Sequence, residues 1–240
     1  MRLPIVFVHG MRVSGTMWRP VIKALPSGYP VAAPDLPGHG SRRAERFTMD
    51  AAVDAVAEAV DRVGGRALVA GLSLGGYVAI ATAARLPDQV AGVVAMGCTA
   101  LPEHGGWIYR RLAQIAAANP QRANRLSYHS LTRTLPAPLG RALVAGGLYC
   151  EAMPDAVAAV LSFDALAALA RYPHRVWLVN GTLDHFRVDE RTFLAACRDG
   201  RLLHLAGRGH LGVLADPTLP RLLLDFARLA APETEARPAA

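Results

Sequence analysis

The sequence contains few cysteines and has no long apolar run. Its 240 residues include three cysteines, Cys98, Cys150 and Cys197, which lie far apart and form no Cys-x-x-Cys pair. This spacing excludes a disulfide framework and a cysteine zinc site, and it is typical of buried thiols in a reducing compartment. No stretch of about 18 apolar residues is present, which excludes a membrane-spanning helix. We therefore expect a cytoplasmic globular protein.

Lysine is nearly absent, and aromatic residues are scarce. Of the 26 basic residues all but Lys23 are arginine, and they exceed the 19 acidic residues to give a net charge of +7. Nucleic-acid-binding proteins usually cluster their cations on one face or interleave them with aromatic residues. Here the arginines are spread along the chain and aromatics make up only 6%. We therefore do not expect nucleic-acid binding, whereas an acidic protein partner stays open because diffuse positive charge steers association.

Short β-branched runs alternate with helical patterns along most of the chain. The hydrophobic fraction of 52% is typical of a globular domain with a full core. The strand-like runs are residues 4–8, 31–33, 67–70, 90–96, 176–179 and 202–205. The helical segments are residues 16–25, 49–63, 74–85, 189–198 and 218–229. This alternation predicts an α/β fold with a mostly parallel sheet of about six strands and helices on both faces.

The alternation stops in residues 101–172, which contain no strand-like run. Prolines and glycines divide this segment into helical stretches. Its length of about 70 residues is too great for a simple crossover between two strands. We interpret it as an all-helical cap inserted into a core formed by residues 1–100 and 173–231. The tail, residues 232–240, is expected to be frayed.

The motif Gly-Leu-Ser-Leu-Gly-Gly at residues 71–76 is the strongest chemical signal. It follows one strand-like run directly and opens the next helix. A serine on such a turn adopts a strained backbone with its hydroxyl exposed, and the flanking glycines let strand and helix approach closely. The N–H of Leu74 lies at the helix N-terminus, where it can face a developing oxyanion. The motif therefore favours Ser73 as a nucleophile over a serine that only caps the helix.

A serine nucleophile of this kind requires an acid and then a histidine later in the chain. Asp184 follows the strand-like run 176–179, and His210 follows the run 202–205. Both residues are expected at the carboxyl ends of strands, where the sites of open α/β sheets assemble. The order and spacing therefore predict Asp184 and His210 as the partners of Ser73.

Other residues compete for these two roles. Asp189 is an alternative acid, although its position also fits the first turn of the next helix, where the dipole favours a carboxylate. His185 and His204 are alternative bases. His204 lies within a strand pattern and is expected to face the sheet, whereas His210 lies in a glycine-flanked loop that is free to reach the serine. Asp184 and His210 are therefore preferred.

Five segments together make the chain resemble the α/β-hydrolase fold superfamily over nearly the whole sequence outside the cap. They are His9-Gly10, the Asp-Leu-Pro-Gly-His-Gly loop at residues 35–40, the serine motif, the Gly-Thr-Leu-Asp loop at residues 181–184, and Gly209-His210. The set is specific for the superfamily but not for a substrate. One departure is that the chain begins at what would be the family's third strand. The first two antiparallel strands of the family are therefore expected to be absent.

The resemblance implies a serine-hydrolase mechanism that needs no metal or organic cofactor. Carried over by position, Met11 supplies a second oxyanion N–H beside that of Leu74, with its side chain toward the acyl pocket. His9 and His39 are expected to be structural histidines that hold their loops by hydrogen bonds. Family members that act on sp³ carbon, the epoxide hydrolases and haloalkane dehalogenases, place Asp at the nucleophile position. Ser73 therefore implies a carbonyl electrophile in an ester, a lactone, a thioester or a ketone with a scissile carbon–carbon bond.

The residues of the predicted cap do not identify the substrate. Its apolar residues fit an apolar pocket or the packing of cap on core, and we place Trp107 with Met11 and Leu74 among the substrate-binding residues. The cap is also basic. Arg110-Arg111 fit either a solvated helix face or the phosphate of a carrier-protein arm, as in related carrier-protein esterases and thioesterases. Cys98 is expected to be a buried thiol rather than part of the pocket.

Three functions follow from this reading. The preferred one is hydrolysis of a carboxylic ester or lactone of a small apolar substrate through an acyl-enzyme. The second is a thioesterase or esterase that acts on acyl chains carried by an acyl carrier protein. The third is a non-hydrolytic reuse of the fold as a cyclase, lyase or binding protein, because a fold does not fix a function. No oligomeric state is indicated.

Overall fold

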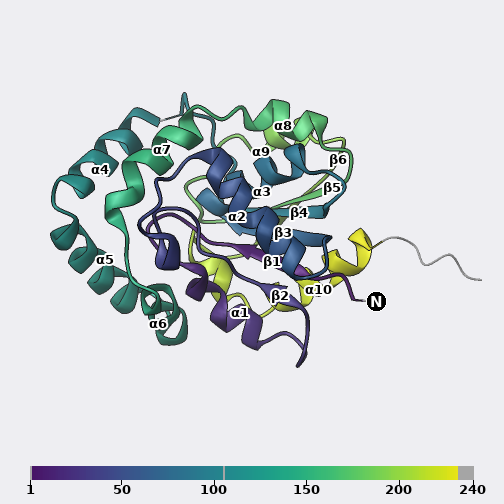
Figure 1. Ribbon diagram of the computed structural model, residues 1–240, viewed down its shortest axis with the longest axis horizontal. Coiled ribbons are helices and arrows are strands. Elements are labelled where there is room, and N and C mark those ends of the chain that lie inside the picture. The colour runs from purple at the N-terminus through teal and green to yellow at the C-terminus, as the bar shows by residue number, and fades with distance from the viewer. Residues whose placement is uncertain (1, 105, 232–240) are drawn as a thin grey trace, which may run out of the picture.

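A six-stranded, entirely parallel sheet forms the centre of the computed structural model, which describes residues 2–104 and 106–231. The strand order is β2-β1-β3-β4-β5-β6. The strands are β1 (Ile5–Val8), β2 (Val31–Ala32), β3 (Ala67–Leu72), β4 (Val90–Met96), β5 (Arg175–Gly181) and β6 (Asp199–Leu205). Helices cover both faces (Figure 1). This architecture confirms the predicted α/β fold, and the tail at residues 232–240 lies outside the described residues.

The last strand is longer than its apolar run predicted. β6 begins at Asp199 because the backbone ladder with β5 runs from Arg175 opposite Asp199 to Gly181 opposite Leu205. The two side chains at the start of this ladder form an ion pair, with Arg175 Nε 2.7 Å from Asp199 Oδ2. Hydrophobicity marks only the buried part of a strand, whereas main-chain pairing continues into its polar end.

Alternate residues of the buried strands build two apolar layers, one on each face of the sheet. In β1, Val6 and Val8 contact one layer, whereas Ile5 and Phe7 contact the other. The first layer is covered by α2 (Met49–Arg62), α3 (Leu74–Arg85) and α9 (Glu190–Ala196). The second is covered by α1 (Arg19–Lys23) and α10 (Leu219–Ala230). Burial on both faces explains why these strands read as continuous apolar runs.

One predicted helix is divided in two. Residues 16–25 form a 3₁₀ turn, η1 (Gly15–Trp18), followed by the short helix α1. Pro20 lies in the first turn of α1, where its missing N–H removes no helical hydrogen bond. The proline is therefore compatible with a new helix start but not with the interior of one long helix.

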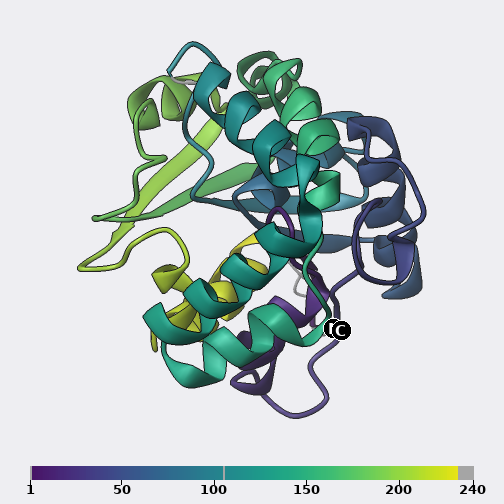
Figure 2. The same cartoon turned by 90° about the vertical axis from the view of Figure 1, so that its left-hand side faces the viewer.

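The described residues of the segment between β4 and β5 form helices joined by loops, with no strand among them. It contains α4 (Gly106–Ala118), α5 (Pro120–Thr134), α6 (Ala137–Ala145), the 3₁₀ turn η3 (Cys150–Ala152), α7 (Met153–Leu161) and α8 (Ala165–Arg171). Figures 1 and 2 show α4, α5, α6 and α7 together on one side of the sheet. The helix α8 instead packs against α3 and α9, with Ala168 and Leu169 buried in the core cluster. Helix α8 thus contacts helices of the core, whereas the expected cap boundary at residue 172 stays a prediction.

No single helix in the described ranges is long and apolar enough to cross a membrane. The neighbouring segments Ala137–Ala145 and Cys150–Leu161 would suffice jointly by length and composition alone, but they are bent by 70° at their junction.

The three cysteines are free thiols. Cys98 and Cys150 are buried, and Cys197 is half-buried. Burial raises the pKa of the Cys197 thiol to about 11 and that of the Cys98 thiol further still. These thiols are therefore protonated at neutral pH and are poor nucleophiles.

Candidate active site

Ser73 occupies a sharp turn between β3 and α3. Its backbone has φ 57° and ψ −121°, a conformation that residues with a side chain rarely adopt. Gly71 is required because a Cβ there would lie 2.0 Å from the carbonyl oxygen of Gly75. Gly75 is required because its Cβ would lie 2.2 Å from the carbonyl oxygen of Val8. The two glycines thus allow the strand and helix to approach closely enough to hold the serine in this strained turn.

The loop after β1 lies against this turn. A Cβ on Gly10 would be 3.4 Å from the carbonyl oxygen of Leu72 and 3.7 Å from the Cβ of Ser73. His9 anchors the loop: its Nδ1 donates to the carbonyl oxygen of Gly10 (2.8 Å), and its Nε2 accepts from the N–H of Leu36 (2.9 Å). Burial, and then the neighbouring His39, lower the pKa of His9 to about 3. A neutral His9 therefore fixes the backbone beside Ser73.

Two backbone N–H groups are free at this point. Among the hydrogen bonds of the described residues, none uses the N–H of Met11 or that of Leu74 as a donor. Leu74 is the first residue of α3, so its N–H has no partner within the helix. Both residues line the pocket that contains Ser73. The two donors are available to an oxygen atom bound there.

Asp184 and His210 form a hydrogen-bonded pair at the carboxyl ends of β5 and β6. The Nδ1 of His210 lies 3.0 and 3.1 Å from the two carboxylate oxygens of Asp184. The carboxylate is buried, and its Oδ1 also accepts from the N–H of Phe186 (2.9 Å). Burial opposes ionisation, but the hydrogen bonds and the charge of His210 outweigh it and hold the pKa of Asp184 below its usual value. An ionised Asp184 therefore orients the imidazole through Nδ1.

The alternative residues have other partners. The Oδ2 of Asp189 accepts from the N–H of Leu101 (2.8 Å) and contacts the Nδ1 of His104 (2.9 Å). His204 lies on β6 with its Nε2 2.9 Å from Oε1 of Glu190. His185 lines the pocket, but its Nδ1 is 4.0 Å from Asp184, farther than that of His210. Asp184 and His210 therefore form the close pair.

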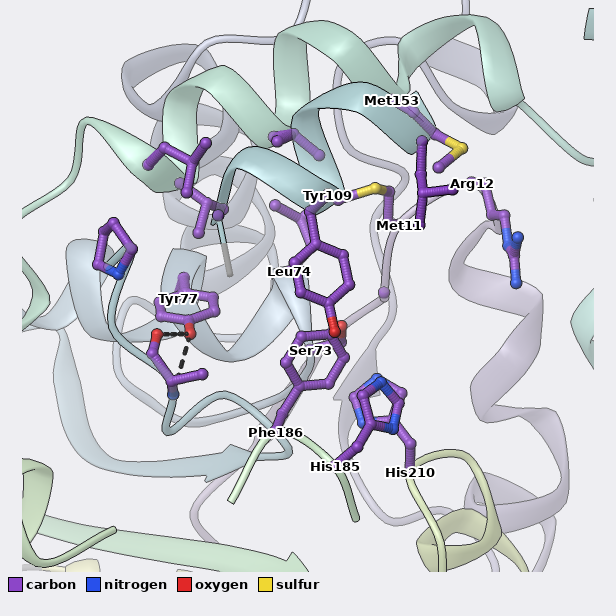
Figure 3. A pocket seen from close by; sticks show the side chains of 18 of the residues that line it. Met11, Arg12, Ser73, Leu74, Tyr77, Tyr109, Met153, His185, Phe186 and His210 are labelled. Atoms are coloured by element: carbon purple, nitrogen blue, oxygen red, sulfur yellow. Dashed lines mark hydrogen bonds between the residues drawn. The ribbon is translucent and has the colours of Figure 1, made fainter. Parts of the chain in front are cut away.

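Ser73 and His210 line one pocket of about 510 Å³. Figure 3 shows both side chains on the same side of this pocket, with Tyr109 and Phe186 beside them. The rings of Tyr109 and Phe186 lie 5.1 Å apart, and the ring of Phe186 lies 4.7 Å from that of His210. Most of the other lining residues are apolar. Helices α4 to α7 supply several of them, among them Leu112, Ala116, Leu131, Leu143, Met153 and Val157. The site is therefore an apolar cavity with a hydroxyl, an imidazole and two N–H donors at one wall.

The sequence model of the alpha/beta hydrolase family matches residues 5–219 of the chain. The chain belongs to the alpha/beta hydrolase family. Solved structures of the fold include a thermophilic esterase from Thermogutta terrifontis (21% identity, TM-score 0.76, covering 95% of this chain and 90% of that one). The enol-lactonase from Burkholderia xenovorans LB400 is as similar (21% identity, TM-score 0.77, covering 95% and 92%). At these identities the likeness shows the shared fold.

Curated relatives of the chain include a lipase and several esterases. Lipase LipV from Mycobacterium tuberculosis is 45% identical over 92 residues, which are 38% of this chain and 35% of the relative. The pimeloyl-[acyl-carrier protein] methyl ester esterase from Neisseria meningitidis serogroup C is 42% identical over 87 residues, 36% of this chain and 33% of that one. The chain thus matches about a third of the length of these relatives.

The structure does not bring Trp107 to the pocket of this alpha/beta hydrolase. Its side chain is 73% exposed, and it is absent from the residues that line the described cavity. Helix α4 instead turns Tyr109, Leu112 and Ala116 toward the pocket. At about 100° per residue, Trp107 is rotated by roughly 160° from Tyr109 around the helix axis. The prediction of Trp107 as a substrate-binding residue is therefore corrected to Tyr109 and its neighbours on the same face.

Arg12, His104 and Phe186 also line the pocket. The sequence alone indicates no role for these three residues. Arg12 follows Met11, and Phe186 lies two residues after Asp184. This closeness to predicted site residues is the only signal that the sequence offers for them. Proximity to a motif gives no side-chain direction, and that direction depends on loop conformations which only the structure supplies.

Proposed function

We propose that the protein is a serine hydrolase that cleaves the carboxylic ester or lactone bond of a small apolar substrate. One observation carries the proposal: the strained Ser73 lies in the same pocket as His210, and the Nδ1 of His210 is hydrogen-bonded to the buried carboxylate of Asp184. This combination of an exposed nucleophile, a base and an orienting group is the arrangement used for acyl transfer. Membership of the alpha/beta hydrolase family, with lipase and esterase relatives, supports the same reaction class.

The proposed reaction has two halves. Ser73 Oγ attacks the carbonyl carbon while His210 Nε2 takes the hydroxyl proton, and Asp184 stabilises the resulting imidazolium. The carbonyl electron pair moves onto oxygen, where the N–H groups of Met11 and Leu74 hold it, each worth roughly 3 kcal/mol of barrier. Collapse breaks the ester C–O bond, and the alcohol leaves with the proton from His210. Water then attacks the acyl-enzyme with His210 again as the base, releasing the acid and restoring Ser73.

The pocket supports a substrate with an apolar acyl part. Helices α4 to α7, which we take as the cap, supply a large share of its apolar wall. A cavity of about 510 Å³ is in the range of small-molecule sites. A serine nucleophile requires a carbonyl electrophile, because displacement at sp³ carbon is the task of the carboxylate nucleophiles in this fold.

Hydrolysis of p-nitrophenyl esters of increasing acyl length tests the proposal. We expect kcat/KM to rise to one preferred length and then fall as the chain outgrows the cavity. Ala116→Leu, which adds three carbons to the pocket wall, is expected to move the optimum to shorter acyl chains. Ala118→Leu, on the exposed side of the same helix, is the matched control and should leave the optimum unchanged. Folded protein that hydrolyses none of these esters would contradict the assignment.

A carrier-bound acyl ester is a second candidate substrate, favoured by the outer surface of α4 and α5. Residues 106–134 contain no Asp or Glu and five arginines: Arg110, Arg111, Arg122, Arg125 and Arg133. All five are exposed, and none forms an ion pair within the described residues. Guanidinium groups bind phosphate well, and a carrier protein presents its acyl chain on a phosphate-containing arm. The relatives that are pimeloyl-[acyl-carrier protein] methyl ester esterases support this candidate.

The double variant Arg110→Gln/Arg111→Gln separates the two candidates. If a carrier-linked ester is the substrate, its kcat/KM should fall about tenfold or more, while that of a free methyl ester changes less than about twofold. Arg221→Gln/Arg228→Gln on α10, which covers the second apolar layer of the sheet, is the charge-matched control. An unchanged rate with the carrier-linked ester, or an equal loss in the control, would remove the carrier hypothesis.

A further inference from the structure

Arg12, like Ser73, has a positive φ, which is uncommon for a residue with a side chain. Among the non-glycine residues that the structure describes, these two have φ in the left-handed region, at 60° and 57°. Both line the same pocket. Such conformations persist only where the surroundings impose them, and they concentrate at catalytic and ligand-binding positions. The conformation of Ser73 is explained by its proposed role as the nucleophile. The conformation of Arg12 needs a separate explanation.

The backbone of Arg12 is pinned on both sides. Its N–H donates to Nε2 of His39 (3.1 Å), and its carbonyl oxygen accepts from the N–H of Tyr149 (2.9 Å). The Nδ1 of His39 donates to the carbonyl oxygen of Pro37 (2.9 Å), which leaves Nε2 as the acceptor. Burial lowers the pKa of His39 and keeps this acceptor neutral. These hydrogen bonds therefore fix the position of the Arg12 backbone, from which the side chain extends.

The guanidinium of Arg12 has few partners for its five N–H donors. Its Nη1 donates to Oγ of Ser127 on α5 (3.3 Å), and no carboxylate of the described chain lies within ion-pair distance. Glu151, in the neighbouring η3, contacts Arg43 and Asn124 instead. A half-buried cation in this setting is costly unless an anion accompanies it.

Arg12 is the one Lys, Arg, Asp or Glu residue of the described chain that lines this pocket. Another imidazole of the pocket, that of His104, already has a carboxylate partner, because its Nδ1 lies 2.9 Å from Oδ2 of Asp189. Figure 3 shows Arg12 beyond Met11 and Met153, on the side of the pocket away from Tyr77. A ligand whose carbonyl meets Ser73 therefore has a permanent positive charge at one end of its apolar path.

We propose that Arg12 is an anion-binding subsite, and that the preferred substrates are half-esters of dicarboxylic acids. The ester carbonyl lies at Ser73, an aliphatic chain follows the apolar wall, and the free carboxylate of the acyl part pairs with the guanidinium. The planar guanidinium matches a carboxylate through two parallel hydrogen bonds. The substrate class rests on the ester hydrolysis proposed above, whereas the anion site itself does not.

Paired substrates test the substrate class. Monomethyl esters of C4 to C8 dicarboxylic acids are compared, by proton release, with methyl esters of monocarboxylic acids of equal length. We expect wild type to prefer the charged ester. In Arg12→Gln, kcat/KM for the charged ester should fall about 10- to 100-fold, mainly through KM, with less than about threefold change for the neutral ester. Arg12→Lys should recover part of the preference, because the charge remains and the planar fork is lost.

Two further readouts separate the possible failures. Ser127→Ala removes the hydrogen bond that the guanidinium donates within the described residues, and it should preserve the preference for charged esters. Loss of the preference in Ser127→Ala, or equal losses on both esters in Arg12→Gln, would mean that Arg12 only supports the position of α5. Calorimetric binding of free adipate to wild type and to Arg12→Gln tests the site without catalysis. Binding to wild type alone supports the subsite even if no ester is hydrolysed. Equal binding, or none to either protein, overturns it.

Discussion

Replacing Ser73 with alanine is expected to lower kcat for ester hydrolysis by about 10⁴- to 10⁶-fold. The variant keeps the pocket and the two free N–H donors, but it has no oxygen that can form the acyl-enzyme. Because nucleophile and base act as one unit, His210→Ala should cost about as much, and the double variant should lose little more. Steady-state rates with a p-nitrophenyl ester, with folding checked by circular dichroism, measure these losses. Activity retained in Ser73→Ala would place the nucleophile elsewhere.

Ser73→Gly distinguishes the catalytic role of the residue from its backbone strain. Glycine adopts positive φ without the steric penalty that a Cβ imposes. We therefore expect Ser73→Gly to be as inactive as Ser73→Ala, yet more stable than Ser73→Ala by about 1 kcal/mol in free energy of unfolding. Urea unfolding of the two variants measures the difference. Equal stabilities would show that the conformation of φ 57° is not a source of strain.

Replacing Asp184 with asparagine is expected to lower kcat by about 10⁴-fold with little change in the fold. The carboxylate contacts Nδ1 of His210 with both oxygens, which selects the tautomer that leaves Nε2 free to accept the serine proton. An amide offers an N–H on that side and favours the wrong tautomer. The depressed pKa of Asp184 keeps the carboxylate ionised at neutral and mildly acidic pH, and its stabilising effect is lost only as the pH falls below the usual Asp range.

Asp189→Asn is the matched control for Asp184→Asn. Asp189 is the other carboxylate of the same loop, and it holds the N–H of Leu101 and the ring of His104. Its replacement should change kcat by less than about tenfold, since it has no contact with His210 that could orient the base. A larger loss in Asp189→Asn than in Asp184→Asn would reverse the assignment of the acid.

The parts of this molecule that sequence reasoning predicts well are those with local physical causes. Parallel strands buried on both faces produce continuous apolar runs, so all six strands of the sheet were visible. The turn at Ser73 depends on two nearby glycines whose Cβ atoms would collide with backbone, and both glycines are part of the motif. Asp184 and His210 follow from their places after β5 and β6, because parallel strands bring their carboxyl ends to one edge.

Features that depend on tertiary context were missed. Helix α4 carries apolar residues around much of its circumference, so periodicity alone did not tell that Tyr109 faces the pocket and Trp107 faces outward. Helix α8 is apolar like α6 and α7 of the same segment, and only the structure shows that it packs against α3 and α9. The role of Arg12 depends on a left-handed backbone imposed by His39 and Tyr149, residues distant in sequence.

The most direct test of the central claim is intact-mass spectrometry after treatment with a fluorophosphonate, followed by peptide mapping. This reagent phosphonylates a serine only when a base activates it and an oxyanion site accepts its P–O group. We predict one adduct on wild type, located at Ser73, no adduct on Ser73→Ala, and strongly slowed labelling of His210→Ala. An adduct on a different residue, or labelling of Ser73→Ala at the wild-type rate, would contradict the assignment of Ser73 as the nucleophile.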